Sequence, residues 1–252
     1  MTDRSSPAGA GNAVTAHYDD HLAPVYSWSV GGADAAIAEG ARWLATLPLP
    51  AGQGRVLDLG AGFGATAIPL ARAGHRVVAV DTSAALLGEL AELAEAASVA
   101  CVHGDLVAAV RDQPAAWDLI LCVGDTLPHL ASHAEVEELL AALARGLTPG
   151  GVAVLAYRPR RELAPDARFV LVHADARRTL TAFLEPIDDD HQRVWDVLHE
   201  HEGETTTMKV SSYPKLRIEP GWLAERAVHC GLAVAEATPY RGMVVQVLRR
   251  RA

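Results

Sequence analysis

Three glycines and an acid in the first third of the chain are spaced for binding a nucleoside-containing ligand. Gly60, Gly62 and Gly64 follow a short apolar run, which predicts a buried parallel strand ending in a tight glycine turn. A helix after these glycines would point its free N–H groups at a ligand. Asp81 ends the next apolar run, about twenty residues beyond Gly60, where a carboxylate can accept hydrogen bonds from a ribose diol.

Two classes of cofactor compete for this unit. Gly60, Gly62 and Ala65 also fit the dinucleotide fingerprint with alanine in the last position, which predicts an NAD(P) site. Asp58 lies two residues before the first glycine, and a carboxylate there suits a cationic amino group better than a pyrophosphate, which it would repel. Residues 58–64 resemble motif I of the class I S-adenosylmethionine (SAM) methyltransferases. In that family the glycine loop passes the methionine part of SAM, and the acid after the second strand binds the ribose.

The resemblance continues further along the chain. Asp105 follows a third short strand, at the place where this family has an acid that hydrogen-bonds the adenine amino group. The next residue, Leu106, would flank the adenine ring. The resemblance implies SAM as cofactor and S-adenosylhomocysteine as product. It implies a cofactor site formed by Tyr18, Tyr26, Asp58, Gly60, Ala61, Gly62, Asp81, Thr82, Asp105, Leu106 and Val123.

The elements that must position these residues alternate between strands and helices. Apolar runs that predict buried strands occur at residues 99–102, 117–123 and 152–157, and amphipathic helices are predicted at 82–97 and 135–147. This alternation predicts an α/β fold with a Rossmann-like, doubly wound parallel sheet, whose ligands bind at the carboxyl ends of the strands. The resemblance adds that the sheet has seven strands, with strand seven antiparallel. Leu-Thr-Pro-Gly-Gly at 147–151, expected as a tight turn before the fifth strand, is a further habit of the family.

A long segment after the fifth strand breaks the alternation. Four strand patterns at 169–172, 178–185, 193–201 and 205–213 predict an antiparallel β insertion that caps the substrate site. We therefore expect five parts: a disordered N-terminus (1–14), an N-terminal helical lid (15–50), a SAM-binding core (51–157), the β cap (158–217), and a C-terminal helix and strands that complete the core (218–252).

The segment from Gly124 to Leu130 points to one branch of this family. It is similar to the segment after strand four in small-molecule methyltransferases related to glycine and sarcosine N-methyltransferases, which have Asn at the position of Asp125. Tyr18 and Tyr26 resemble tyrosines of an N-terminal element that folds over SAM in those enzymes. This branch slightly favours nitrogen over oxygen as the methyl acceptor.

Methyl transfer from a sulfonium is an in-line displacement that depends mainly on positioning, and a base is needed only when the acceptor arrives protonated. The candidate catalytic residues are His129 and Asp125; His129 is alternatively a structural histidine, and Asp125 either positions a cationic amine or caps a helix. The candidate substrate contacts are His17, Trp28 and Arg241, the last as a clamp for a carboxylate. No metal site is expected, because no third ligand accompanies the histidine pair that begins at His129.

Composition places the chain among single-domain enzymes. Its 252 residues are half apolar, and its net charge of −9 argues against a nucleic-acid partner. Residues 1–12 lack the apolar stretch of a secretory signal, and no apolar run has membrane-spanning length. The three dispersed cysteines indicate a reduced, cytoplasmic protein. A homodimer is left open.

The sequence thus predicts a SAM-dependent methyltransferase that transfers a methyl group to a nitrogen or oxygen of a small-molecule metabolite. Two rivals are an NAD(P)-dependent oxidoreductase and a SAM-binding protein without catalytic turnover. Cofactor binding and methyl transfer to a panel of small molecules would distinguish the three.

Overall fold

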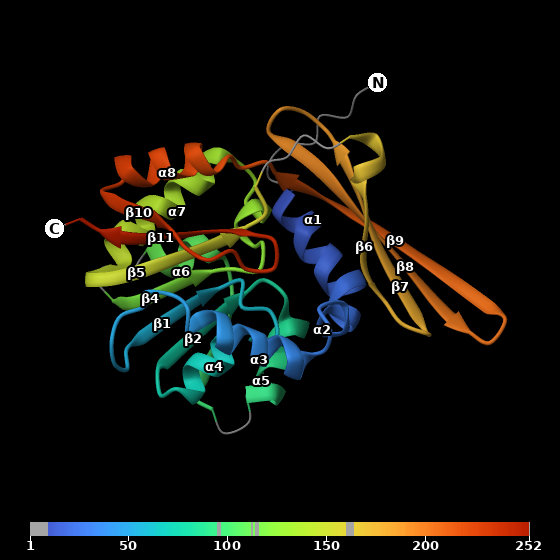
Figure 1. Cartoon of the computed structure of the whole chain (residues 1–252), viewed down its shortest axis with the longest axis horizontal. Helices are drawn as coiled ribbons and strands as arrows, with labels where there is room; N and C mark the ends of the chain where they lie inside the picture. Colours follow the sequence, from blue (N-terminus) through green and yellow to red (C-terminus); the bar gives the residue numbers. More distant parts are fainter. Residues whose placement is uncertain (1–9, 95–96, 112, 114–115, 160–163, 252) are drawn as a thin grey trace.

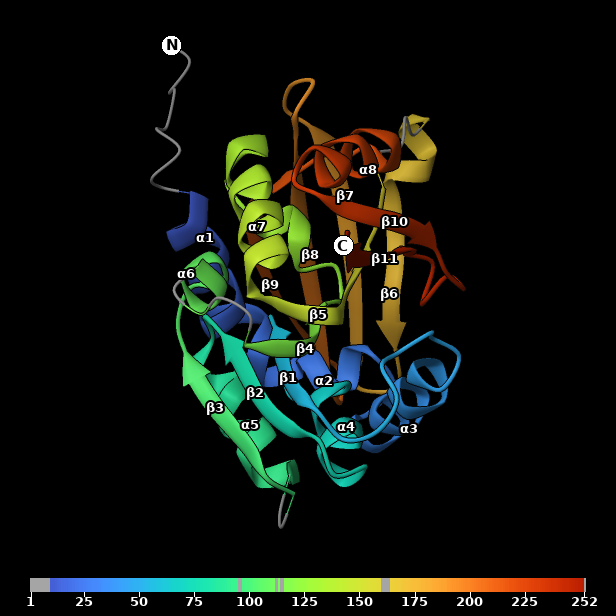
Figure 2. The same ribbon diagram turned by 90° about the vertical axis from the view of Figure 1, so that its left-hand side faces the viewer.

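Two separate β-sheets frame the molecule (Figure 1). The computed structural model of the chain describes residues 10–94, 97–111, 113, 116–159 and 164–251. Figure 2 looks onto the larger sheet and its helices, with the strands of the smaller sheet behind them. The larger sheet is called the core sheet below, and the smaller one the cap sheet.

The core sheet has seven strands in the order β10-β11-β5-β4-β1-β2-β3. All neighbouring pairs from β5 to β3 are parallel, whereas β11 runs antiparallel to both β5 and β10. This order confirms the predicted Rossmann-like sheet with one antiparallel strand. The strands are β1 (Arg55–Leu59), β2 (Arg76–Asp81), β3 (Val99–His103), β4 (Trp117–Cys122), β5 (Leu147–Tyr157), β10 (Leu232–Glu236) and β11 (Val244–Arg250).

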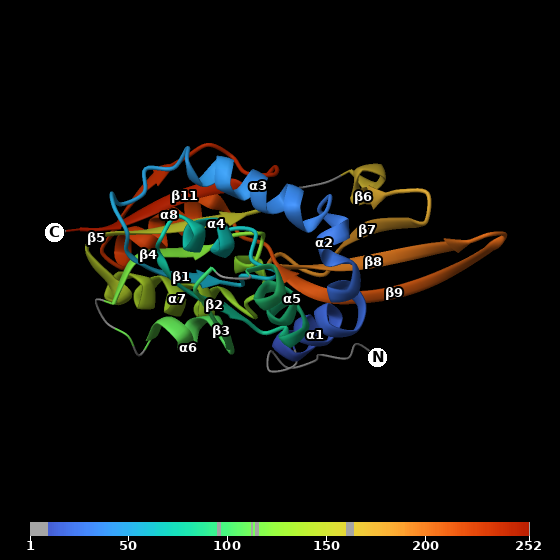
Figure 3. The ribbon, with the colours of Figure 1, turned by 90° about the horizontal axis from the view of Figure 1, so that it is seen from below.

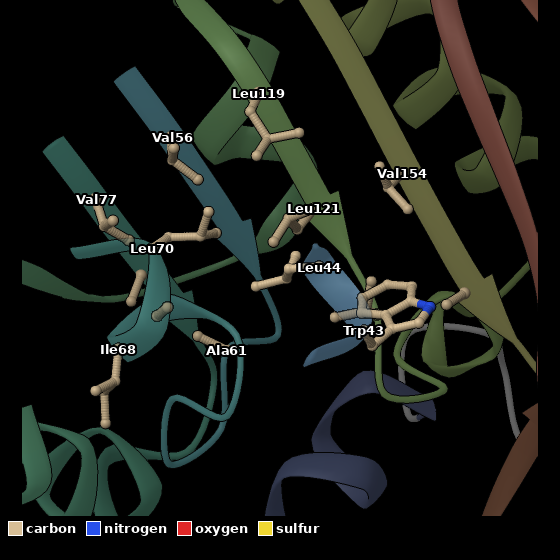
Figure 4. Packing of buried hydrophobic residues seen from close by; sticks show 14 of the residues in the cluster. Trp43, Leu44, Val56, Ala61, Ile68, Leu70, Val77, Leu119, Leu121 and Val154 are labelled. Carbon is tan, nitrogen blue, oxygen red and sulfur yellow. The ribbon is translucent and has the colours of Figure 1, made fainter. Parts of the chain in front are cut away.

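Helices cover both faces of the core sheet because its central strands are apolar on both sides. On β1, Val56 packs into one buried cluster and its neighbour Leu57 into the other. Figure 4 shows the first cluster, in which Trp43 and Leu44 pack near Leu121 and Val154 of the sheet. That face carries α3 (Ala33–Leu44), α4 (Ala67–Arg72) and α5 (Ala84–Ala94), and the other carries α6 (Leu106–Arg111), α7 (His133–Gly146) and α8 (Pro220–His229).

The cap sheet is an antiparallel meander in the order β6-β7-β8-β9, which confirms the predicted insertion. Figure 3 shows the long β8–β9 hairpin extending away from the core. Its strands alternate in burial: Leu180, Ala182 and Val194 are buried on the face that meets the N-terminal segment. The strands are β6 (Phe169–Ala174), β7 (Arg178–Pro186), β8 (His191–Glu202) and β9 (Thr205–Leu216).

The N-terminal segment lies between the two sheets (Figure 1). It comprises α1 (Ala10–His17), a π-helical turn η2 (Tyr18–Leu22), a 3-10 turn η3 (Ala23–Val25) and α2 (Tyr26–Ser29). Val14 of α1 is buried in a cluster with Ala182 and Val194 of the cap. Through this contact the segment joins the cap to the core.

Three local features of the structure refine these expectations. Residues 10–14, expected to be disordered, begin α1, because Val14 has the apolar cap to pack on; residues 1–9 lie outside the described residues. The segment 148–151, expected as a tight turn, falls within the bounds of β5, where it lies between the pairs Trp117–Leu147 and Leu119–Val152 and Gly150 has a φ of 81°. The short helix α6 follows Asp105 without having been predicted. The boundaries of the five parts stay predictions.

No helix among the described residues combines the length and the hydropathy that crossing a bilayer needs.

Candidate active site

Two cavities meet at the carboxyl ends of the core strands. The first, called the loop cavity, has a volume of about 250 Å³ and lies over the ends of β1, β2 and β3. The second, called the cap cavity, has a volume of about 400 Å³ and lies between the core and the cap sheet. Six residues line both cavities and form their common wall: Tyr18, Tyr26, Gly60, Gly62, Gly124 and His129.

Asp81 is the central polar group of the loop cavity. Its Oδ2 accepts a hydrogen bond from the Gly62 N–H at 2.8 Å, and its Oδ1 accepts one from the Ser83 N–H at 2.9 Å. Burial raises the pKa of Asp81, and these two hydrogen bonds oppose the increase. The carboxylate is thereby fixed to the glycine loop on one side and to the start of α5 on the other.

Only glycine fits the first position of the loop. Gly60 has a φ of 70°, and a Cβ placed on it would lie 2.3 Å from Cγ2 of Thr126. The Thr126 hydroxyl donates to the Val123 carbonyl at 2.9 Å, so Thr126 cannot simply turn away without losing this bond. The close approach of the loop after β1 to the loop after β4 therefore shapes the common wall.

Asp105 and Leu106 close the far end of the loop cavity. The Oδ1 atom of Asp105 accepts a hydrogen bond from the Ala108 N–H at 2.8 Å and so caps α6. The N-terminal segment covers the cavity from above, where Asp19 accepts a hydrogen bond from the Ser83 hydroxyl at 2.6 Å. Thr82 also lines the loop cavity, whereas Ala61 and Val123 line the cap cavity.

Asp58 lines neither cavity, in contrast to its expected place in the cofactor site. Its side chain is fully buried behind the glycine loop, where Oδ2 accepts a hydrogen bond from the Thr66 hydroxyl at 2.7 Å. Burial raises the pKa of Asp58 to about 7, and no hydrogen-bond partner among the described residues reaches its Oδ1. This hydrogen bond ties the end of β1 to Thr66 at the start of α4, so Asp58 supports the glycine loop from within.

Asp125 faces the cap cavity with its charge already compensated. It is 5% exposed, has a φ of 74°, and forms ion pairs with Lys215 of β9 and Arg158 at the end of β5, the latter at 2.8 Å. Burial alone would raise the pKa of Asp125, but the two cations hold it below its ordinary value. Asp125 is therefore an ionised link between core and cap, rather than a free base or an open site for an amine.

His129 stands among tyrosines in the common wall. Its ring centroid lies 5.5 Å from that of Tyr18 and 5.3 Å from that of Tyr213. Burial and the nearby Lys215 lower the pKa of His129 to about 3, and burial raises the pKa of Tyr26 to about 12. At neutral pH this wall therefore presents a neutral imidazole and protonated hydroxyls. His129 ends the 3-10 turn η4 (Leu127–His129).

The structure separates the three expected substrate contacts. His17 is buried, and its Nε2 lies 2.9 Å from Oδ2 of Asp196, outside both cavity linings. Trp28 also lies outside them, with its indole N–H donating to Asp175 at 2.7 Å. Arg241 does line the cap cavity, but its guanidinium forms an ion pair with Glu39 at 2.5 Å.

Sequence reasoning missed three polar residues of the cap: Asp196, Tyr213 and Lys215. All three lie on the inner face of the cap sheet, at alternate positions of β8 and β9 with buried apolar residues such as Val194. The sequence did carry a signal for them, because polar residues at the inward-facing positions of a strand must find partners when they are buried. Such residues are therefore candidates for a functional site.

Comparison with known proteins relates the glycine loop and the strands around it to a methyltransferase domain. Residues 56–151 match the model of a methyltransferase domain. The chain is 35% identical to a cypemycin N-terminal methyltransferase of a Streptomyces species over 122 residues, which are 48% of this chain and 46% of that protein. It is 31% identical to a glycine/sarcosine N-methyltransferase of Halorhodospira halochloris over 109 residues, 42% of this chain and 41% of that protein. The chain thus matches less than half the length of these two relatives.

Solved structures share nearly the whole fold. The CcbJ methyltransferase of Streptomyces caelestis superposes with a TM-score of 0.75 at 23% identity, over 93% of this chain and 98% of that one. CalS10, an amino pentose methyltransferase of Micromonospora echinaspora whose structure contains SAM, gives a TM-score of 0.70 at 19% identity, over 90% of this chain and 95% of that one. Residues 56–151 thus match a methyltransferase domain, and the chain as a whole has the Rossmann-like fold of these SAM-dependent methyltransferase structures.

Proposed function

We propose that the protein transfers the methyl group of SAM to a nitrogen or oxygen atom of a small-molecule acceptor. The observation that carries this proposal is the common wall of the two cavities, because methyl transfer needs donor and acceptor side by side. SAM would occupy the loop cavity and the acceptor the cap cavity. One sequence relative is named a glycine/sarcosine N-methyltransferase, which favours nitrogen.

The residues of the loop cavity fit SAM in charge. The carboxylates of Asp81, Asp105 and Glu135 line it, and no lysine or arginine stands among its described lining residues. Such a wall suits the cationic sulfonium and ammonium of SAM and disfavours the pyrophosphate of a dinucleotide. Asp81 would bind the ribose hydroxyls, and Asp105 with Leu106 would hold the adenine.

The chain's own residues contribute position and exclusion of water. When bound, SAM supplies an already activated methyl group. Tyr18, Tyr26 and His129 surround the point where the cavities meet, and the N-terminal segment covers it. Since His129 is a weak base and Asp125 is paired with two cations, we assign neither the role of general base. An amine acceptor would lose its proton to solvent before the methyl group is transferred.

Calorimetric titration of SAM, S-adenosylhomocysteine and NAD tests the proposal. We expect both sulfur nucleosides to bind and NAD not to bind. Asp81→Asn should weaken S-adenosylhomocysteine by roughly 10- to 100-fold, the range for hydrogen bonds to a charged group. Glu92→Gln, on the exposed face of α5, is the matched control and should leave affinity unchanged. Binding of NAD alone, or SAM affinity untouched by Asp81→Asn, would contradict the proposal.

A further inference from the structure

The part of the cap cavity that the cap sheet contributes is mainly apolar. Three neighbouring strands turn aliphatic side chains into it: Val170 and Val172 from β6, Leu180, Ala182 and Leu184 from β7, and Val194 from β8. The volume of about 400 Å³ lies in the range of sites for drug-sized ligands. Val170 and Val172 are each 41% exposed on this wall, whereas Leu180, Ala182 and Val194 already pack against the N-terminal segment. A compact polar acceptor would leave the exposed valines in contact with water, so the wall indicates an acceptor with an apolar body.

One carboxylate interrupts the apolar wall. Asp196 of β8 stands opposite Ala182 of β7 and Ser211 of β9, and it is 5% exposed. The ion pairs of the described residues give Asp196 a single partner, the ring of His17, whose other nitrogen lies 2.9 Å from the Ser211 hydroxyl. Asp125, in the same cavity, faces two permanently charged side chains instead. Asp196 is thus the acid of this cavity that retains capacity for a cation.

We propose that the methyl acceptor is an amphipathic amine, whose apolar body lies on the inner face of the cap sheet and whose amino group is bound by Asp196. This inference rests on the proposed function and names its substrate class. It narrows the expected small-molecule metabolite to one with an extended apolar part.

The transfer balances for such an acceptor. The amine enters as an ammonium ion at Asp196 and loses one proton to solvent. Its nitrogen lone pair then forms the bond to the methyl carbon while the carbon–sulfur bond breaks, and the sulfur keeps that electron pair. The nitrogen becomes a methylated ammonium, and the carboxylate of Asp196 stabilises the charge that develops there.

A graded series of ligands tests the apolar part. The probes are n-alkylamines from propylamine to octylamine, the n-alcohols of the same lengths, and glycine, each titrated into protein saturated with S-adenosylhomocysteine. We expect affinity to rise about fourfold per methylene until the cavity is filled. Amines should bind at least tenfold more tightly than the matching alcohols, and glycine should bind more weakly than every amine of the series.

Two pairs of variants assign these preferences to residues. Val170→Ser removes aliphatic surface from the exposed part of the apolar wall and should reduce the gain with chain length, whereas Thr181→Ser, on the opposite face of β7 from Ala182, should preserve it. Asp196→Asn should remove the preference of amine over alcohol. His17→Gln breaks the same His17–Asp196 contact but keeps the carboxylate, so it should preserve the preference; this separates recognition from anchoring of α1.

The outcomes distinguish this inference from the proposed function. Failure of S-adenosylhomocysteine to bind wild-type protein would remove the proposed function and, with it, this inference. Normal S-adenosylhomocysteine binding with no gain along the alkyl series, or with equal affinity for amines and alcohols, would overturn the substrate class alone. An amine preference that survives Asp196→Asn would overturn the role of this residue.

Discussion

The two cavities are built by different kinds of contact. In the loop cavity the acids bond to backbone N–H groups of nearby turns, as Asp81 does with Gly62 and Ser83 and Asp105 does with Ala108. In the cap cavity, side chains distant in sequence meet one another, as Asp125 does with Lys215 and His17 with Asp196. The first arrangement is fixed by the local course of the chain, whereas the second exists only when the cap has docked on the core.

The largest expected effect comes from a substitution in the glycine loop, far in sequence from the cap sheet. Gly60→Ala introduces a Cβ that would lie 2.3 Å from Thr126 in a residue with a φ of 70°. The loop must move to relieve this clash, so we expect S-adenosylhomocysteine affinity to fall roughly 1,000-fold, measured by calorimetry.

Gly88→Ala is the control for this substitution. Gly88 lies in α5 with open space around its Cα, so alanine there should leave affinity unchanged and stabilise the helix by about 0.5–1 kcal/mol. Full affinity in Gly60→Ala would show that the loop tolerates displacement and would weaken the contrast between the cavities.

The next effect breaks the docking of the cap. Lys215→Met leaves the buried carboxylate of Asp125 with Arg158 as its remaining partner, and we expect a loss of about 3 kcal/mol in the free energy of unfolding. Urea unfolding at pH 7 measures it. Adding Asp125→Asn removes the uncompensated charge and should recover more than half of the loss. Equal instability of the single and double variants would show that Lys215 acts through packing instead.

This contrast explains how much could be predicted from the sequence. The parallel part of the core sheet and the glycine loop are encoded by neighbouring residues, namely apolar runs, glycines and the acid that ends β2. The placement of Asp81 on the loop cavity therefore followed from spacing, whereas the antiparallel strand and the position of Asp105 followed from the family resemblance. Asp58 is buried outside both cavity linings, a position that spacing along β1 does not reveal, and its role in the cofactor site stays a prediction.

The partners in the cap could not be predicted from local pattern. Asp125 was chosen for its position after β4, but its ionic partner Lys215 follows 90 residues later, and His17 and Asp196 are separated by 179 residues. Such pairs depend on how an antiparallel insertion folds back, which no short motif encodes. Cytoplasmic location and pairing into a homodimer stay predictions.

Asp58 offers a smaller, pH-dependent test of the loop cavity. Its pKa rises from an ordinary value of 3.8 to about 7 on folding, so its contribution to stability is full below pH 4 and is lost as the pH rises towards 7. Asp58→Asn does not titrate there. The difference in unfolding free energy between variant and wild type should therefore shift in favour of the variant by on the order of 2 kcal/mol between pH 5 and pH 7. Urea unfolding at both pH values measures it, with the exposed Asp34→Asn as control; a constant difference would contradict the burial of an uncharged acid.

The smallest expected effect concerns the wall that the cavities share. Because burial lowers the pKa of His129 to about 3, its imidazole stays neutral throughout a reaction run between pH 5 and pH 9. With an accepted amine as substrate, the pH profile of kcat/KM should therefore have the same shape in wild type and in His129→Gln, although its height changes through lost packing against Tyr18 and Tyr213. A limb near pH 6.5 that disappears in His129→Gln would make this histidine the general base. The common wall would then take part in proton transfer through His129, in addition to positioning the donor and the acceptor.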